Sequence, residues 1–141
     1  MSGDAAAIIK ALNLKPHPEG GWYAETWRAD ARDGERPSGT AIYYLLEKGQ
    51  RSHWHRVDAA EVWHFYAGAP LRLSISRDGQ VTEQLTLGAN IGAGERPQII
   101  VPPNAWQSAE SLGDWTLVGC TVSPGFLFET FEMAPEDWAP G

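Results

Sequence analysis

Two histidines and a glutamate in the middle of the chain have the types and spacing of metal ligands. His53 and His55 are separated by one residue, and Glu61 follows six positions after His55. Because side chains alternate between the faces of a β-strand, both histidines are expected to project the same way, with Cα atoms roughly 6.5–7 Å apart. Two imidazoles and a carboxylate are the facial set of non-haem iron, and they also suit manganese, nickel or zinc. The spacing therefore predicts a divalent-metal site.

The same residues have simpler interpretations. His53 and His55 could be hydrogen-bonded strand residues, and Glu61 could accept a structural hydrogen bond. Glu61 could also be a general base, and His55 is the second candidate for a catalytic role. His64 falls on the face of its strand opposite to Glu61 and is expected at the surface or an interface rather than at a metal.

Strand alternation suggests which residues would contact a ligand. Trp63 shares the face of Glu61, and Arg51 shares the face of the two histidines, where it would suit a carboxylate or phosphate group. Near the start of its strand, Arg51 could equally lie in solvent. Tyr43 and Tyr44 occupy opposite faces of their strand, so one of them faces the interior. The sequence does not settle which, and we name Tyr43 as the candidate for substrate contact.

An N-terminal turn carries two further polar residues. His17 and Glu19 stand before the pair Gly20-Gly21, which is typical of a tight turn. Either side chain could reach a pocket, but we interpret the segment mainly as a turn that seats the first long strand.

Length, charge and cysteine content restrict the class of protein. The 141 residues are enough for one domain with a real core, so we expect a single domain over residues 1–141. The net charge of −7 and the absence of a basic run argue against nucleic-acid or anionic-membrane partners. The single cysteine, Cys120, favours a reducing compartment, and the sequence has neither a signal-peptide pattern nor a long apolar span. We therefore expect a cytoplasmic, soluble protein, with Cys120 as a small buried residue.

The rest of the sequence predicts a helix followed by many short strands. A helix is expected over residues 4–13, with Asp4 as its cap and Pro16 beyond its end. Strands are then expected from residue 22 to residue 131, at spacings near 8–12 residues. Asp78-Gly79 between two of them is a hairpin signal. This spacing is typical of an all-β sandwich or barrel.

Several motifs together resemble the cupin superfamily. The run from Gly49 to Gly68 is similar to the first cupin motif, although the interval from His55 to Glu61 is longer by a residue or two. The run 102–107 is similar to the second motif, with Gln107 where the fourth ligand, histidine, is usual. Segments 17–25 and 117–126 resemble a bacterial and fungal cupin branch that is catalogued as a domain of unknown function.

The resemblance implies a double-stranded β-helix, the cupin jelly-roll barrel, over residues 22–131. It also implies a homodimer, and it adds Gln107 to His53, His55 and Glu61 as a possible fourth metal ligand. It does not imply an organic cofactor or an established reaction.

Three functions remain open at this point. The first is a divalent-metal-dependent isomerase, lyase or oxygenase that acts on a small polar metabolite. The second is a metal-free epimerase or isomerase of the sugar-nucleotide type, with a histidine base, a tyrosine acid and Arg51 holding an anionic group. The third is a non-catalytic barrel that binds or senses a small molecule.

Overall fold

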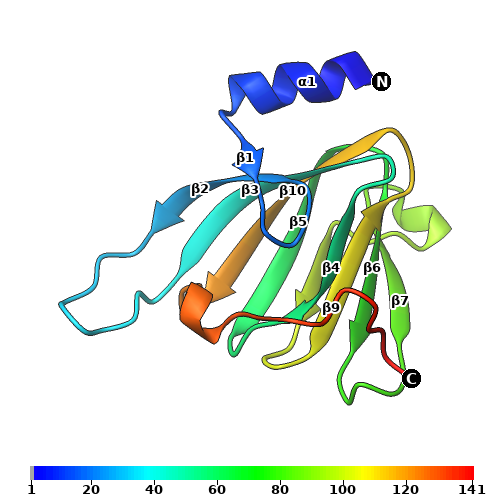
Figure 1. Ribbon diagram of the computed structural model, residues 1–141. Coiled ribbons are helices and arrows are strands. Elements are labelled where there is room, and N and C mark those ends of the chain that lie inside the picture. Colours follow the sequence, from blue (N-terminus) through cyan, green and yellow to red (C-terminus); the bar gives the residue numbers. More distant parts are fainter. Residues whose placement is uncertain (1) are drawn as a thin grey trace.

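Two antiparallel β-sheets face each other, and one helix lies on the outside (Figure 1). The computed structural model describes residues 2–141. The first sheet has six strands, in the order β1 (Lys15–Pro16), β2 (Trp22–Arg28), β3 (Thr40–Glu47), β10 (Trp115–Ser123), β5 (Ala60–Gly68) and β8 (Gln98–Val101). The second has five strands, in the order β11 (Glu132–Met133), β4 (Arg51–Arg56), β9 (Trp106–Ser111), β6 (Leu71–Ser76) and β7 (Glu83–Leu87). The all-β prediction is confirmed.

Within the described residues 2–141, helical structure is limited to three short pieces. Helix α1 (Ser2–Ala11) begins and ends two residues earlier than predicted, and two 3₁₀ turns follow later, η1 (Ile91–Ala93) and η2 (Phe128–Thr130). The segment 126–131, at the end of the predicted barrel, contains η2 and leads into β11 (Glu132–Met133). Among residues 2–141, no helix has the length and apolar character needed to cross a membrane.

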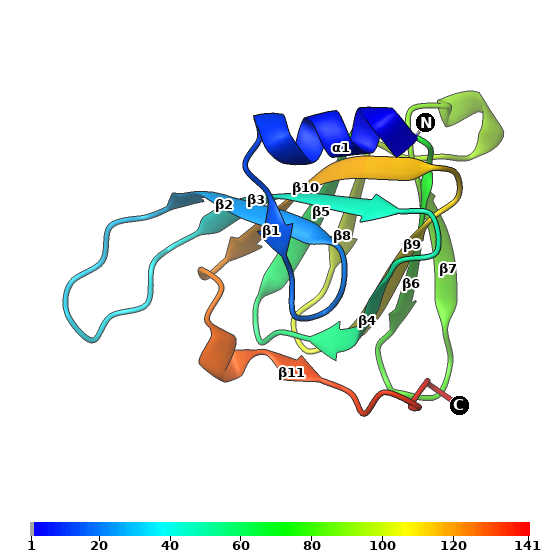
Figure 2. The ribbon, with the colours of Figure 1, turned by 45° about the horizontal axis from the view of Figure 1, so that its top comes forward.

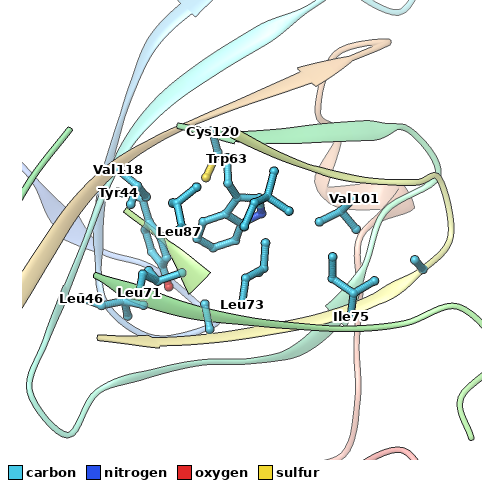
Figure 3. Packing of buried hydrophobic residues seen from close by; sticks show 13 residues of the cluster. Tyr44, Leu46, Trp63, Leu71, Leu73, Ile75, Leu87, Val101, Val118 and Cys120 are labelled. Carbon is cyan, nitrogen blue, oxygen red and sulfur yellow. The ribbon is translucent and has the colours of Figure 1, made fainter. Parts of the chain in front are cut away.

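The core between the sheets follows the alternation of β-strands. Tyr44 and Leu46 of β3 and Trp63 of β5 point inward and pack against β6 residues such as Leu71 and Leu73 (Figure 3). Burial of these apolar side chains is the main force that holds the two sheets together.

The outer face of the six-stranded sheet is covered by α1 (Figure 2). Leu45 of β3 packs there against Ala5 and Leu14, and Tyr43 and Ile8 join the same cluster. Tyr43 and Tyr44 thus lie on opposite faces, as expected, and Tyr44 is the one that points between the sheets.

One interruption of the five-stranded sheet affects the site. The pairing of β4 with β9 shifts register between Ser52 and His55, which marks a β-bulge. As a consequence, Trp54 and His55 are both buried although they are neighbours in sequence. Strand alternation cannot predict side-chain direction across such a bulge.

Candidate functional site

A cavity of about 300 Å³ lies between the two sheets. His17, Glu19, His55 and Glu61 line it with groups that can exchange protons. Phe126, Phe128 and Phe131, from the segment that includes η2, supply much of its apolar lining. The site therefore combines polar side chains from β4, β5 and the N-terminal turn with an aromatic wall from the C-terminal segment.

The N-terminal turn reaches this cavity because Gly20 allows close contact with β4. Gly20 has φ of +110°, and a Cβ atom there would lie 2.0 Å from the carbonyl oxygen of Arg51. The backbone N–H of His53 donates to the carbonyl oxygen of Glu19 at 2.9 Å, which fastens the turn to the strand. Sequence reasoning treated His17 and Glu19 mainly as turn residues. The structure gives them both roles, seating the chain and lining the cavity.

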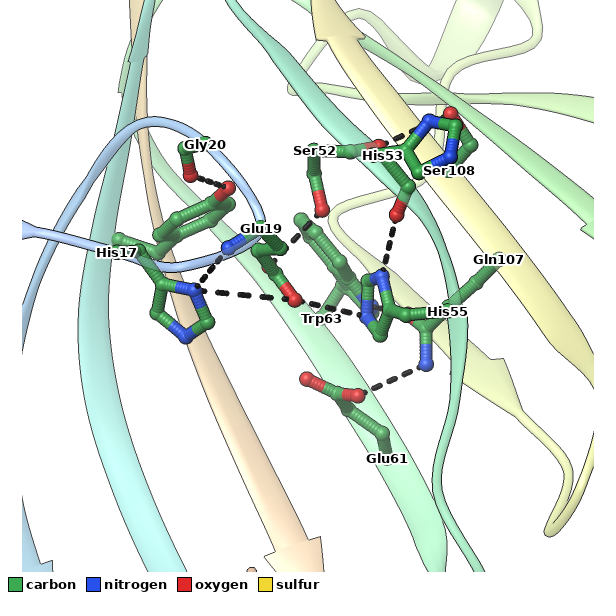
Figure 4. Close-up of polar contacts among 11 residues, drawn as sticks. His17, Glu19, Gly20, Ser52, His53, His55, Glu61, Trp63, Gln107 and Ser108 are labelled. Atoms are coloured by element: carbon green, nitrogen blue, oxygen red, sulfur yellow. Dashed lines mark hydrogen bonds and ion pairs between the residues drawn. The ribbon is translucent and has the colours of Figure 1, made fainter. Parts of the chain in front are cut away.

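The side chains of Glu19 and His55 are buried and contact each other (Figure 4). Nδ1 of His55 is 2.7 Å from the carbonyl oxygen of His53, which can only accept, so Nδ1 carries a hydrogen. Nε2 of His55 is 3.1 Å from Oε2 of Glu19. That contact needs one further proton, either on the imidazole or on the carboxyl group.

Burial changes the proton affinities of this pair. Desolvation raises the pKa of Glu19 and lowers the pKa of His55, because both charged forms lose water. Ser52 supports the carboxyl group by donating its hydroxyl hydrogen to Oε1 of Glu19 at 2.9 Å. Both shifts favour the proton on the carboxyl group of Glu19, with Nε2 of neutral His55 as its acceptor, so the pair joins a proton donor to a base.

Glu61 is a second proton-exchanging group on the same cavity. Its side chain is held from behind, since Nε2 of Gln107 donates to Oε1 of Glu61 at 2.9 Å and Nε1 of Trp63 donates to Oε1 of Gln107 at 2.8 Å. Desolvation raises the pKa of Glu61 from 4.5 to about 7, although the nearby His55 acts in the opposite direction. A carboxyl group with this pKa gives up and takes back a proton readily at neutral pH.

Cys120 lies beside Glu61 in the lining but has the wrong properties for a nucleophile. Burial raises the pKa of its thiol well above the usual range, and the carboxyl groups of Glu61 and Glu19 add to this effect. The thiol therefore stays protonated. The predicted burial of Cys120 is confirmed.

Of the predicted metal ligands, the structure brings His55 and Glu61 to the cavity but not His53. Nε2 of His53 is 2.9 Å from the carbonyl oxygen of Pro135, in the C-terminal segment, and the ring does not line the cavity (Figure 4). The prediction that His53 and His55 share a face is therefore wrong, because the bulge in β4 changes the alternation between them.

The predicted substrate contacts Arg51, Trp63 and Tyr43 all lie outside the cavity lining. Arg51 is exposed and donates through Nε to the hydroxyl of Ser108 at 3.0 Å. Trp63 is inside, as predicted, but it packs in the core behind Gln107. Tyr43 lies on the helix-covered face. The positions of these three residues do not support contact with a substrate in this cavity.

The predicted ligand set does not fit a divalent ion. Gln107 is buried as predicted, but its carboxamide oxygen accepts from Trp63 and its NH₂ group faces Glu61. This orientation follows from the indole N–H, which can only donate. Within residues 2–141, no group of three or more His, Cys, Asp or Glu side chains is arranged to hold a metal ion.

Comparison with known proteins identifies the family of this chain. Residues 6–134 match the family described as Cupin superfamily (DUF985). A solved structure from Shewanella oneidensis is 40% identical, with a TM-score of 0.88, and the alignment covers 92% of this chain and 84% of that one. A hypothetical protein from Leishmania major is 35% identical, with a TM-score of 0.84, covering 92% and 86%. No curated protein matches this chain.

A more distant neighbour supports the fold alone. An oxalate decarboxylase variant from Bacillus subtilis is 14% identical with a TM-score of 0.65, and the alignment covers 84% of this chain but 29% of that one. Its two-sheet jelly roll is the fold predicted from the sequence motifs. The match over residues 6–134 and the two solved structures above 30% identity are decisive: this chain belongs to the cupin superfamily, in the DUF985 branch.

Proposed function

We propose that this chain is an enzyme that transfers protons on a small polar metabolite without a metal ion. Glu61 is one acid–base group, and the Glu19–His55 pair is the other. The observation that carries the proposal is that both groups line one cavity of about 300 Å³. Each is also fixed in place by hydrogen bonds, Glu61 by Gln107 and Glu19 by Ser52.

Two acid–base groups on one cavity suit isomerisation or epimerisation. One group removes a proton from a carbon atom next to a carbonyl group, and the other returns a proton to the neighbouring carbon or oxygen. The electron pair of the broken C–H bond stays within the substrate, so no oxidant or reductant is needed. Because Glu61 has a pKa of about 7, it can act in either direction near neutral pH.

The sugar-nucleotide version of this chemistry has less support. A lumenal tyrosine acid was expected. Tyr44, the inward tyrosine of β3, does not line the cavity, and its hydroxyl donates to the carbonyl oxygen of Gly20, whereas Tyr23 of β2 does line the cavity. Burial also raises the pKa of Tyr44 well above the usual range. Moreover, no lysine or arginine is among the residues that line the cavity, and a diphosphate would need such partners. Glu61 takes the place of the tyrosine in our proposal.

Deuterium incorporation tests the proposed reaction without knowledge of the substrate. Untagged, chelator-treated protein is incubated in D₂O with a mixture of small carbonyl metabolites, and mass spectrometry records those that gain one deuterium. We expect incorporation with the native protein and loss of it in Glu61→Gln and His55→Gln. Glu83→Gln, on the exposed part of β7, is the matched control and should keep full activity.

The outcome also separates the other two functions. Incorporation that disappears with chelation and returns with added Fe, Mn, Ni or Zn would support the metal-dependent enzyme and contradict our proposal. A metabolite that binds but never exchanges, converts or yields a product would support a binding or sensing barrel.

A further inference from the structure

His17 lines the cavity, and its ring nitrogen Nε2 has no hydrogen-bond partner among the described residues. Its side chain is 7% exposed, and its Nδ1 accepts a hydrogen bond from the backbone N–H of Glu19 at 3.0 Å. A neutral imidazole whose Nδ1 accepts must carry its hydrogen on Nε2. Among the described residues, no hydrogen bond to Nε2 of His17 is found, and Figure 4 shows this atom on the side of the ring away from Glu19.

Packing holds the ring of His17 in this orientation. The ring lies edge-on to Tyr23, with centroids 4.5 Å apart, and to Tyr44 at 5.6 Å and Phe131 at 6.5 Å. Desolvation also lowers the pKa of His17, which keeps the ring neutral at neutral pH. A fixed, neutral donor in the lining of a cavity selects an oxygen acceptor on a ligand.

The charges around the cavity restrict the ligand further. The lining contains the carboxyl groups of Glu19, Glu25 and Glu61 and no lysine or arginine. Arg28 is near, but its guanidinium is engaged by Glu25 at 2.8 and 2.9 Å and by the carbonyl oxygen of Phe126 at 3.1 Å. An anionic ligand would be buried beside carboxyl groups without a cationic partner, which is costly.

We propose that Nε2 of His17 donates a hydrogen bond to the carbonyl oxygen of an uncharged ligand whose apolar part packs against Phe126, Phe128 and Phe131. The claim that this ligand is a substrate rests on the proposed function. In that reaction, removal of a proton beside the carbonyl group places negative charge on its oxygen. The His17 N–H would stabilise that charge, as a donor fixed before the reaction does.

The tautomer of His17 can be measured on the ligand-free protein. Two-bond ¹H–¹⁵N spectra of ¹⁵N-histidine-labelled protein at pH 7 are expected to show His17 neutral, with its hydrogen on Nε2. His55 serves as an internal reference, because its Nδ1 carries a hydrogen. A hydrogen on Nδ1 of His17, or an imidazolium ring, would overturn the proposal.

Three matched probes test the ligand class. Acetophenone carries a neutral carbonyl group, benzoate an anionic group and benzylamine a cationic group on the same aromatic ring. We expect acetophenone to bind with a Kd below roughly 10 mM and benzoate at least about tenfold more weakly. Benzoate binding as tightly as acetophenone, benzylamine binding more tightly than acetophenone, or no binding of acetophenone in this range would each overturn the proposal.

Variants of His17 identify the donor. His17→Phe keeps a ring without a donor, and we expect acetophenone to bind about three- to tenfold more weakly. His17→Gln keeps an N–H at a similar distance from the backbone and should retain most of the affinity. His64→Phe, on the outer face of β5, is the control and should not change binding. Unchanged affinity in a folded His17→Phe would contradict the assignment.

These binding tests do not depend on turnover. If acetophenone fails while deuterium incorporation succeeds, the ligand class is wrong and proton transfer stands. If acetophenone binds as expected but Glu61→Gln leaves deuterium incorporation intact, the ligand class stands and proton transfer by Glu61 is wrong.

Discussion

The buried carboxamide of Gln107 offers a quantitative test of how Glu61 is held. Gln107 is 0% exposed and joins the indole of Trp63 to the carboxyl group of Glu61. In Gln107→Leu, the indole N–H loses its acceptor inside the core, which costs about 1–3 kcal/mol. The lost bond to Glu61 adds about 0.5–1.5 kcal/mol, and the apolar replacement returns about 1 kcal/mol. The expected net loss is about 0.5–3.5 kcal/mol, with a central value of about 2 kcal/mol.

Urea denaturation measures this loss, and a double-mutant cycle locates it. For a chain of 141 residues, the central loss of about 2 kcal/mol lowers Tm by about 4–8 °C. Trp63→Phe removes the indole donor. Its loss of unfolding free energy should therefore be smaller in the Gln107→Leu background than in the native protein, and the difference between the two losses, the coupling energy, should be about 1–2 kcal/mol. Gln84→Leu, on the exposed part of β7, is the control and should stay within about 0.5 kcal/mol. A coupling below about 0.5 kcal/mol would refute the proposed bridge.

Three further predictions concern single residues of the site. The folded pKa of Glu61 is about 7 and its ordinary value is 4.5, so the native protein should lose about 3 kcal/mol of stability relative to Glu61→Gln as the pH rises from 4.5 to 7. Urea titrations of both proteins across this pH range measure the loss. The absence of such a trend would contradict burial of the carboxyl group. Gly20→Ala forces a Cβ atom against the carbonyl oxygen of Arg51 and should lower the free energy of unfolding, measured by urea denaturation, by more than about 3 kcal/mol. Gly34→Ala, which has positive φ but open space, should cost about 1 kcal/mol, and equal losses would show that the turn does not lie against β4. Cys120 should react with iodoacetamide at pH 8 roughly 100-fold more slowly than a free thiol, and labelling at the free-thiol rate would contradict its protonated, buried state.

Much of the fold was accessible from sequence because its signals are local. The Asp78-Gly79 turn and the strand spacing identify short antiparallel strands, and the motifs around Gly49–Gly68 indicate the jelly roll. Alternation also placed Glu61 and Trp63 inside correctly, because β5 is regular over those residues.

The site itself depends on features that local patterns do not encode. The bulge in β4 turns His53 away from the direction of His55, and the spacing of two histidines gives no sign of it. The placement of His17 and Glu19 arises from contact between the N-terminal turn and β4, more than thirty residues away in sequence. The Gly20-Gly21 pair was the available signal, because a glycine with positive φ often marks a close approach of two backbones.

The pH titration of Glu61, followed by ¹³C NMR of its carboxyl carbon, tests the central claim most directly. The account requires this group to exchange its proton near neutral pH inside the cavity, so it predicts a midpoint at about 7. A Glu61 midpoint near the ordinary value of 4.5 would mean that the carboxyl group is solvated and charged at neutral pH, and acid–base catalysis by Glu61 would be contradicted.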